Sequence, residues 1–392
     1  MTLTPRVIAV ADTDSYVKWG AALVADPRVD GSLVVLDTDL VVSDAQLRAA
    51  TAGVNVPVRR ATLDELPGIL AGYDAILVAA RGPVARVIAR TAARLDPRPV
   101  IVTGLPGISI PATWRALHYR RLCDLFVLHS HREVREFGEL AREREIDQSF
   151  ALATLPFARR VHERESEGTD LVFAAQAIVP REREDRIRVA RLLVRAAAAD
   201  PSRRVVLKLR GKPGEHETHR ETDSYPELVG EAPPNLVVSY APMSEALASA
   251  EGLMTVSSTA AIEAAAQGVP VIALDAFGVS GELINLVFEG SGLFGTEDDV
   301  IDRRFRHPAP GWLEENYFHD AADDTWATAL EALIADPRPR EVPRISGLRE
   351  VWERHLALGS RDRSWQARAV AIVGHPARFL VRLARRMKHL FG

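Results

Sequence analysis

The sequence contains a single cysteine, Cys123, among its 392 residues. One cysteine excludes a disulfide framework and a cysteine-rich metal site, and it is typical of a reducing compartment. No apolar run reaches the roughly 18 residues that a membrane-spanning helix needs, and the opening residues lack the charged-then-apolar pattern of a signal peptide. These absences predict a cytoplasmic protein.

An excess of positive charge is also missing. The formal net charge is -4, which disfavours nucleic acid as a partner, although local basic patches are compatible with that value. With 47% apolar and 26% charged residues, the composition is that of an ordinary globular protein. A chain of 392 residues is too long for one ordinary core, so we expect two α/β domains of about 150 to 180 residues each.

Short apolar runs alternate with helix-like stretches, a pattern typical of a parallel sheet covered by helices. In the first half, the expected strands are 6–10, 32–36, 75–79, 100–102 and 125–128, and the expected helices are 43–52, 84–95 and 132–144. After a charged stretch at 159–170, the alternation restarts with strands 171–174, 204–209, 236–239, 252–256 and 270–274 and helices 183–199, 244–250 and 259–267. We therefore predict two Rossmann-like, doubly wound domains, 1–165 and 166–345, which face each other across a cleft and are followed by C-terminal helices in 346–392.

The most informative segment is 255–272, TVSSTAAIEAAAQGVPVI. A predicted strand ends at Val256 and a helix begins near Thr259, so Ser257, Ser258 and Thr259 place hydroxyls and backbone N–H groups at a helix start, where a phosphate can bind. These side chains could instead only cap the helix, with Glu263 completing a capping interaction. Three consecutive hydroxyl residues exceed what one cap needs, which favours a donor-phosphate site.

This segment resembles the donor-site signature of GT-B glycosyltransferases. The Ser-Ser pair followed by Glu-Ala and Gly-x-Pro-Val is similar to capsule transferases that use CMP-Kdo or CMP-sialic acid, and to CDP-glycerol polymerases. Those families carry Lys-x-His-Pro one strand earlier, where this chain has Arg210 at the histidine position and an interrupted spacing to Pro213. The opening at 11–20 also resembles a group of actinobacterial glycosyltransferases without a known substrate. The resemblance implies the GT-B fold and transfer of a sugar from a nucleotide donor, with a CMP-sugar among the candidates.

Further donor contacts are expected on the second domain. Lys208, Arg210 and Lys212 alternate along and just past a predicted strand, so they can offer charged donors to the phosphates, unless they form a solvated strand end. Glu215 follows on a loop, where it could contact a ribose or base, and Gln176 lies at the turn after the first strand of this domain. Amides and cations of this kind can carry the leaving nucleotide, so we expect neither a metal nor a cofactor.

Asp12 and Asp14 directly follow the first strand of the first domain. An inverting sugar transfer needs a base for the acceptor hydroxyl, and either carboxylate is well placed for that role. Either residue could instead cap the helix that starts near Ser15, and the two could also fill one role each. At other strand ends of this domain, the candidate acceptor-binding residues, each of which could equally serve turn geometry, are Arg81, Gly104, Gly107, His129 and His131.

The string at 290–295 matches G-x-G-x-x-G, which is a feature of nicotinamide-dependent enzymes. It lies late in the second domain, and an acidic turn that would repel a pyrophosphate follows it. A dinucleotide fingerprint should open a domain at its first strand-to-helix turn. We therefore do not expect a nicotinamide enzyme.

The segment 365–391 is basic and amphipathic, with apolar side chains such as Phe379, Leu383 and Met387 at helical spacing between arginines. This pattern predicts a helix in an anionic membrane interface, or alternatively a helix packed on the first domain. The leading hypothesis is a peripheral glycosyltransferase on the inner face of the cell membrane, acting on a polysaccharide or lipid-linked acceptor. The alternatives are a UDP-sugar 2-epimerase, which needs no acceptor, and a membrane-associated scaffold protein of a polysaccharide assembly complex that has no catalytic activity.

Overall fold

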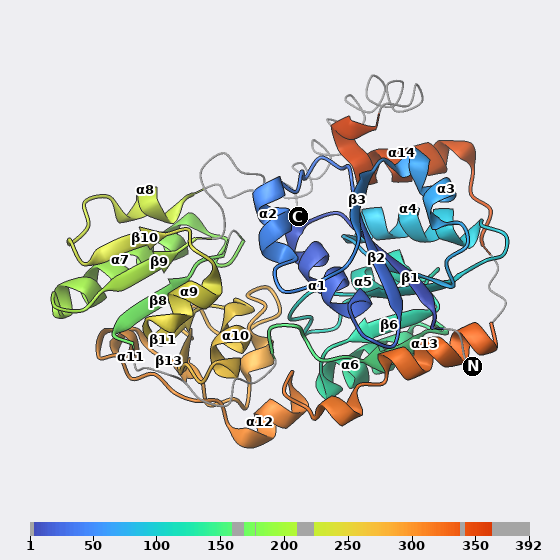
Figure 1. Ribbon diagram of the computed structural model, residues 1–392. Helices are drawn as coiled ribbons and strands as arrows, with labels where there is room; N and C mark the ends of the chain where they lie inside the picture. Colours follow the sequence, from blue (N-terminus) through green and yellow to red (C-terminus); the bar gives the residue numbers. More distant parts are fainter. Residues whose placement is uncertain (1–3, 159–167, 177, 210–222, 338–341, 363–392) are drawn as a thin grey trace, which may run out of the picture.

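The computed structural model describes residues 4–158, 168–176, 178–209, 223–337 and 342–362. Two parallel-sheet α/β units lie side by side, each with helices on both faces of its sheet (Figure 1). This arrangement confirms the predicted pair of Rossmann-like domains. The predicted amphipathic helix at 365–391 lies outside the described residues. Within them, no helix is both long and apolar enough to cross a membrane.

The first sheet has seven parallel strands in the order β3-β2-β1-β4-β5-β6-β7. The strands are β1 (Arg6–Ala11), β2 (Asp30–Leu36), β3 (Val58–Ala61), β4 (Ala75–Ala79), β5 (Val100–Gly104), β6 (Leu125–Leu128) and β7 (Ser149–Leu152). The helices of this domain are α1 (Asp14–Val24), α2 (Asp44–Ala50), α3 (Leu66–Leu70), α4 (Gly82–Ala93), α5 (Trp114–Arg120) and α6 (His131–Glu143). Every residue of β4 is buried, as expected for a central parallel strand covered on both faces.

The second sheet has six parallel strands in the order β10-β9-β8-β11-β12-β13. The strands are β8 (Asp170–Ala174), β9 (Val205–Lys208), β10 (Leu236–Ser239), β11 (Ala250–Thr255), β12 (Val271–Leu274) and β13 (Phe294–Gly295). The helices are α7 (Arg183–Ala199), α8 (Tyr225–Val229), α9 (Met243–Ala248), α10 (Ala260–Ala266), α11 (Glu297–Ile301) and α12 (Pro310–Glu315). Single-turn 3-10 helices lie at Leu63–Glu65, Leu286–Phe288, Ala321–Asp323 and Gly359–Arg361.

Each strand order reverses at one point, between β1 and β4 in the first sheet and between β8 and β11 in the second. Open α/β sheets bind ligands outside the carboxyl ends of the strands at such a reversal, because the connecting helices leave on opposite faces there. The residues that follow these four strands are therefore the ones to compare with the predicted site.

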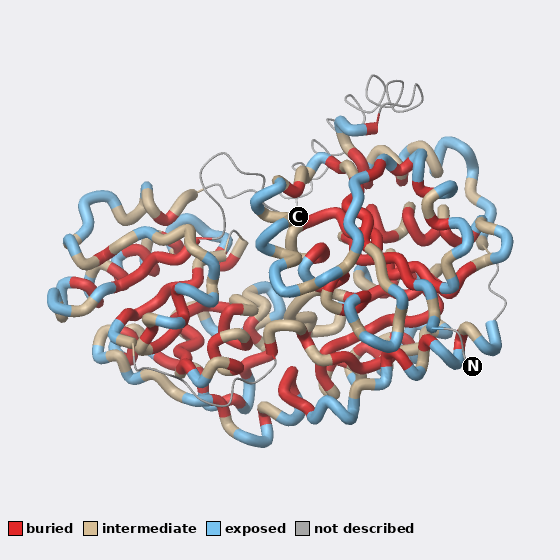
Figure 2. Tube along the Cα trace, viewed as in Figure 1, coloured by how far each residue is buried: buried red, intermediate tan, exposed pale blue. Residues whose placement is uncertain are grey.

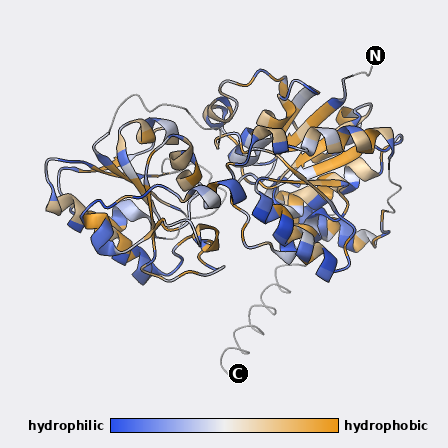
Figure 3. Cartoon of the chain, turned by 90° about the horizontal axis from the view of Figure 1, so that it is seen from below, coloured by the Kyte–Doolittle hydropathy of each residue, from blue (hydrophilic) through white to orange (hydrophobic). Residues whose placement is uncertain are grey.

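Buried residues concentrate in the strands of both domains, and exposed residues lie on the helices and loops around them (Figure 2). Hydrophobic colour concentrates in the sheets, while the covering helices carry hydrophilic stretches (Figure 3). Large, fully buried side chains anchor each core, Trp19 and Phe137 in the first domain and Phe173 and Tyr225 in the second. Burial on both faces explains why the strands appear in the sequence as continuous apolar runs.

The chain returns to the first domain earlier than the predicted division at 345. Helix α13 (Trp326–Ala335) packs on β5, β6 and β7, and the backbone N–H of Thr325 donates to the carbonyl of Leu152 at 2.9 Å. Helix α14 (Gly347–Leu358) then packs on α4. Apolar residues of α13, such as Leu330, cover a face of the first sheet, so this helix belongs to the first core although its sequence follows the second domain.

Three strands and several short helices differ from the sequence expectation. Strand β3 is an edge strand whose arginines are exposed, so it lacks an apolar run. Strand β13 has only two residues. The unpredicted strand β7 pairs with β6 through residues that alternate little in polarity. Such elements depend on a neighbouring strand for their conformation, and local sequence carries little signal for them.

Candidate active site

Asp12 and Arg81 follow β1 and β4 at the reversal point of the first sheet and pair with each other. The Arg81 Nε lies 2.7 Å from Asp12 Oδ2, and the Arg81 backbone N–H donates to Asp12 Oδ1 at 3.2 Å. Asp12 is fully buried. Burial raises the pKa of Asp12, and the Arg81 charge opposes that rise. Asp12 therefore holds Arg81 at the sheet edge and has no surface through which to meet an acceptor.

A second buried cation, Arg120, lies in the same part of the first domain. It donates to the Tyr16 hydroxyl and the Ala80 carbonyl, both at 2.9 Å, and to the Thr103 hydroxyl at 3.2 Å. Burial raises the pKa of the Tyr16 hydroxyl, so Tyr16 stays neutral. Sequence reasoning missed Arg120 because the short helix α5 that carries it was not predicted. Asp14, by contrast, begins α1 and is partly exposed.

His129 and Gly104 surround Trp19 inside the first domain. The Trp19 indole N–H donates to His129 Nε2 at 2.7 Å, which leaves Nδ1 as the protonated nitrogen that donates to the Ala153 carbonyl at 2.6 Å. Burial lowers the pKa of His129 and keeps it neutral. A Cβ on Gly104 would lie 2.3 Å from the Trp19 ring. The structure thus gives both residues a packing role and does not bring them to the surface where an acceptor would bind.

His131 begins α6 and contacts the segment that returns from the second domain. Its Nε2 lies 3.4 Å from Asp323 Oδ2. Close by, the buried Glu133 carboxylate accepts hydrogen bonds from the backbone N–H groups of His129 and Ser109 and, at 2.6 Å, from the Tyr317 hydroxyl. Burial and the Glu133 charge raise the pKa of Tyr317 well above its ordinary value. These contacts fix the returning segment to the first domain.

The reversal point of the second sheet brings together Gln176 after β8 and Ser257 after β11. Gln176 Oε1 accepts from the Ser257 backbone N–H at 3.2 Å and from its hydroxyl at 2.9 Å. The Ser258 Oγ accepts from the backbone N–H of Ala260 at 3.2 Å, so Ser258 forms part of the cap of α10. Thr259 makes no side-chain capping bond and is partly exposed. Ser257 is buried, so Ser258 and Thr259 are the hydroxyl residues nearest the surface.

The charges of one lysine from each domain act on Glu263 of α10. Burial raises the pKa of Glu263, and the positive charges of Lys18 and Lys208 oppose that rise. Lys208 ends β9, is buried and donates to the Leu209 carbonyl. Lys18 is exposed on α1 of the first domain, with Nζ 5.0 Å from the ring centroid of Phe157. Lys18 was not among the predicted site residues, because the sequence marks it only by its position one helical turn after Asp14.

Gly107 brings the two domains into contact. A Cβ on this residue would lie 3.0 Å from Thr259 Oγ1 of the second domain. Gly107 of the first domain and Thr259 of the second therefore lie at a contact between the domains. The predicted donor residues Arg210, Lys212 and Glu215 lie outside the described residues.

The glycine string at 290–295 runs into the edge strand β13, away from the reversal point. Gly290 and Gly292 adopt positive φ values of 75° and 76°, so they make turns. The following helix α11 begins with a capping box of Thr296 and Asp299. Across the residues that the structure describes, no group of three or more His, Cys, Asp or Glu side chains could hold a metal ion.

Residues 7–333 match a protein family described as "Putative glycosyltransferase (DUF6716)". No curated protein matches the sequence. Among solved structures, Staphylococcus aureus MnaA with UDP has a TM-score of 0.57 at 10% identity, over 87% of this chain and 100% of that one. A UDP-glucosyltransferase from Polygonum tinctorium capable of glucosylating indoxyl has a TM-score of 0.52 at 13% identity, over 86% of this chain and 99% of that one. A Listeria monocytogenes "putative UDP-N-acetylglucosamine 2-epimerase" has a TM-score of 0.51 at 12% identity, over 88% of this chain and 100% of that one. These similarities confirm the GT-B-like fold.

Proposed function

The chain belongs to this family of glycosyltransferases, and we propose that it moves a sugar or sugar-like group from a nucleotide donor to an acceptor hydroxyl. The donor phosphates would lie at the carboxyl edge of the second sheet, and the acceptor at that of the first. The action of the Lys18 and Lys208 charges on Glu263 carries this proposal. Charges from both domains thus act on Glu263, which lies one helical turn after the partly exposed Thr259.

Lys208 and Lys18 would stabilise the charge that develops on the leaving phosphate. Fixed cations in a partly buried site are effective there, because they need no reorganisation during the reaction. Glu263, on which both lysine charges act, would position them. Transfer would then need no metal ion, and full activity in EDTA is the expected result.

Asp14 is the proposed base. Asp12 is buried against Arg81, whereas Asp14 is partly exposed at the start of α1. Asp14 and Lys18 lie at positions i and i+4 of one helix, so their side chains lie on the same face. The Lys18 charge acts on Glu263 of the second domain, which supports the proposal that this face of α1 turns towards the donor. A carboxylate there can accept the proton of an acceptor hydroxyl.

The finer parts of the proposal concern donor, acceptor and location. The Ser258 and Thr259 segment favours a CMP-sugar through its resemblance to capsule transferases, while the structural similarity to a UDP complex favours a uridine donor. We propose a polysaccharide or lipid-linked acceptor of the cell envelope, reached from the cytoplasmic side. The basic segment 365–391 would bind the anionic membrane surface.

A ligand screen followed by a transfer assay tests the proposal. A nucleotide sugar that binds the folded protein should raise its melting temperature, so CMP-, CDP-, UDP- and GDP-sugars are compared first. The stabilising donor is then incubated, with a radiolabelled sugar, with and without membrane extract as the acceptor source. Label in polymer or lipid only when extract is present supports transfer. Stabilisation by none of these donors contradicts it, and so does a stabilising donor whose label enters neither polymer nor lipid.

A UDP-sugar 2-epimerase is the second candidate, favoured by the similarity to the Listeria monocytogenes protein described above. Such an enzyme would change the configuration of its UDP-sugar without any acceptor. The same incubation without extract separates the two functions, because conversion of UDP-N-acetylglucosamine into its 2-epimer would be seen there by chromatography. The family description favours transfer.

A further inference from the structure

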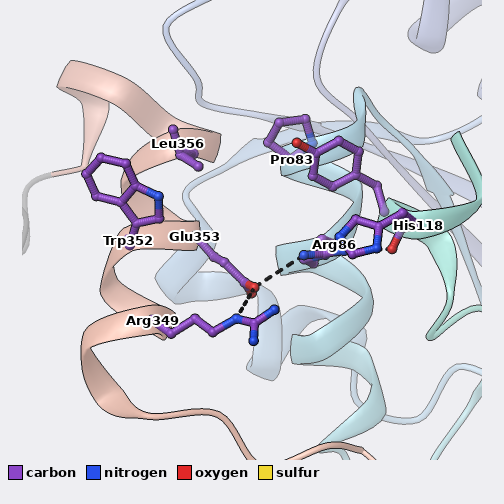
Figure 4. Close-up of a pocket in the computed structure, with 8 residues that line it drawn as sticks. Pro83, Arg86, His118, Arg349, Trp352, Glu353 and Leu356 are labelled. Carbon is purple, nitrogen blue, oxygen red and sulfur yellow. Dashed lines mark hydrogen bonds and ion pairs between the residues drawn. The ribbon is translucent and has the colours of Figure 1, made fainter. Parts of the chain in front are cut away.

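A cavity of about 230 Å³ lies on the first domain between α4, α5 and α14. Pro83, Trp352 and Leu356 line its apolar part. Figure 4 shows the Glu353 carboxylate between the guanidinium groups of Arg86 and Arg349, with Trp352 and Leu356 on the same helix. The cavity thus combines an apolar wall with charged groups.

Positive charge dominates this cavity. The single Glu353 carboxylate accepts from Arg86 at 3.3 Å, from Arg90 at 3.1 Å and from Arg349 at 3.2 Å. Three guanidinium groups therefore share one carboxylate. Burial lowers the pKa of His118, another lining residue, and the charges of Arg86, Arg121 and Arg349 lower it further. The surroundings can accommodate an additional anion.

The exposed face of α14 continues the apolar wall. Leu348, Trp352 and Leu356, the α14 face, are spaced four residues apart and are 84%, 38% and 46% exposed. Residues four apart lie on the same side of a helix. Ala357 and Leu358 on the other side are buried in the first domain. A row of large apolar side chains thus adjoins the cationic cavity.

Helix α14 ends at the carboxyl edge of the first sheet. The Ser360 backbone N–H donates to Asp39, beyond β2, at 2.9 Å, and Arg354 pairs with Asp64, beyond β3, at 2.7 Å. Asp362, the last residue that the structure describes, therefore lies near the edge that carries Asp14. No acidic residue follows Asp362 in the sequence, whereas arginine is frequent. Because both are positively charged, this basic segment is not expected to dock on the cationic cavity. The segment and the cavity with its apolar wall would instead both bind the same kind of surface, one that is anionic and partly apolar.

We propose that the cavity and the α14 face bind an anionic phospholipid membrane, with a lipid phosphate at Arg86 and Arg349 and with Trp352 and Leu356 in the interface. Aromatic and apolar side chains beside basic residues are the usual elements of such contacts. This site lies on the folded first domain and is independent of the proposed sugar transfer. It would hold the acceptor edge of the first sheet close to the membrane.

Vesicle binding by the full-length protein tests this site. A double variant, Trp352→Ser with Leu356→Ser, should bind phosphatidylglycerol vesicles about tenfold more weakly or worse, because it loses apolar area that enters the interface. Both residues are exposed, so an unchanged melting temperature is expected. The matched control is Val238→Ser, which replaces an apolar residue 42% exposed on β10 of the second domain and should leave binding unchanged.

Charge is tested separately with Arg349→Gln, which should weaken binding to phosphatidylglycerol vesicles and reduce its salt dependence. Neutral phosphatidylcholine vesicles should bind weakly in every case. Equal affinity of the double variant and the control would overturn the proposal. So would displacement by millimolar glycerol phosphate, which indicates a site for free phosphate, and so would a concentration-dependent dimer that the double variant abolishes. Donor and acceptor are absent from the assay, so failed sugar transfer cannot produce any of these results.

Discussion

The carboxyl edges of the two sheets occupy equivalent places in their domains and differ in how their polar groups are used. At the first edge, several polar groups pair with one another inside the protein, as in the Asp12–Arg81 pair and the contact of Trp19 with His129. At the second edge, Ser258, Thr259 and Glu263 are only partly buried. The first edge is therefore a rigid support, and the second is the more accessible surface for a ligand.

This difference separates stability from binding. Buried, mutually bonded groups are costly to disturb, because each lost partner leaves an unsatisfied polar atom. Partly exposed hydroxyl and charged groups can exchange water for ligand at little cost. Substitutions at the first edge should therefore act mainly on folding, and those at the second mainly on nucleotide affinity, with Asp14 as the exception.

The largest expected effect is that of Glu133→Ala at the first edge. It should lower the free energy of unfolding by about 3 to 5 kcal/mol, since the buried donors of Ser109, His129 and Tyr317 lose their acceptor. Urea denaturation measures the change. Glu139→Ala, on the exposed side of α6, is the control and should change stability little. Equal effects of the two variants would show that this network does not hold the first edge.

Asp14→Asn tests the exception at the first edge. If Asp14 accepts the acceptor's proton, turnover should fall about a hundredfold or more while donor affinity stays nearly intact. Asp44→Asn provides a matched control, because Asp44 also begins a helix and its side chain is 79% exposed. Asp12→Asn should instead lower the melting temperature, since it disturbs a buried ion pair. Normal turnover of Asp14→Asn would assign the base elsewhere.

Replacing both Ser258 and Thr259 with alanine tests the second edge. Nucleotide-sugar binding should weaken by about 1 to 3 kcal/mol through the loss of hydrogen bonds to a charged phosphate. Isothermal titration calorimetry measures the affinity. Ser43→Ala removes the hydroxyl cap of α2 in the first domain and should cost stability without changing affinity. Unchanged affinity of the double variant would show that the 257–259 segment only caps helix α10 and does not bind the nucleotide sugar.

The smallest expected effect is the pH-dependent stability of Glu263→Gln. Because burial raises the pKa of Glu263 in the folded state, the unfolded chain releases this proton at lower pH, near 4.3. The native protein therefore loses stability as pH rises from that value through the folded-state pKa. Glu263→Gln should be slightly more stable than the native protein at pH 7 and equal to it below about pH 4. Melting curves across this range measure the difference.

Glu245→Gln serves as the control for that comparison, since Glu245 is exposed on α9 and its replacement should leave the stability profile unchanged. A destabilised Glu263→Gln at neutral pH would mean that attraction to Lys18 and Lys208 outweighs the cost of burial. The second edge would then be held together by charge pairing, as the first is.

Much of this architecture is encoded locally in the sequence. Strand β4 and helix α7 match the predicted ranges 75–79 and 183–199, because continuous apolar runs and helical periodicity are strong signals when both faces of an element are buried. The alternation of such elements also determined the two-domain α/β fold. The Ser257 to Thr259 junction was recognisable because strand, turn and helix follow one another within a few residues.

Only the tertiary structure decided which candidates are accessible and which are paired. The sequence treated Asp12 and Asp14 alike, and packing buried the first against Arg81, a residue from another strand end. It likewise paired His129 with Trp19, returned α13 to the first sheet and exposed Glu263 to the charge of Lys18. Each of these outcomes joins residues that are far apart in the chain. Local periodicity carries no information about such contacts, because burial and electrostatic partners depend on how complete elements pack in space.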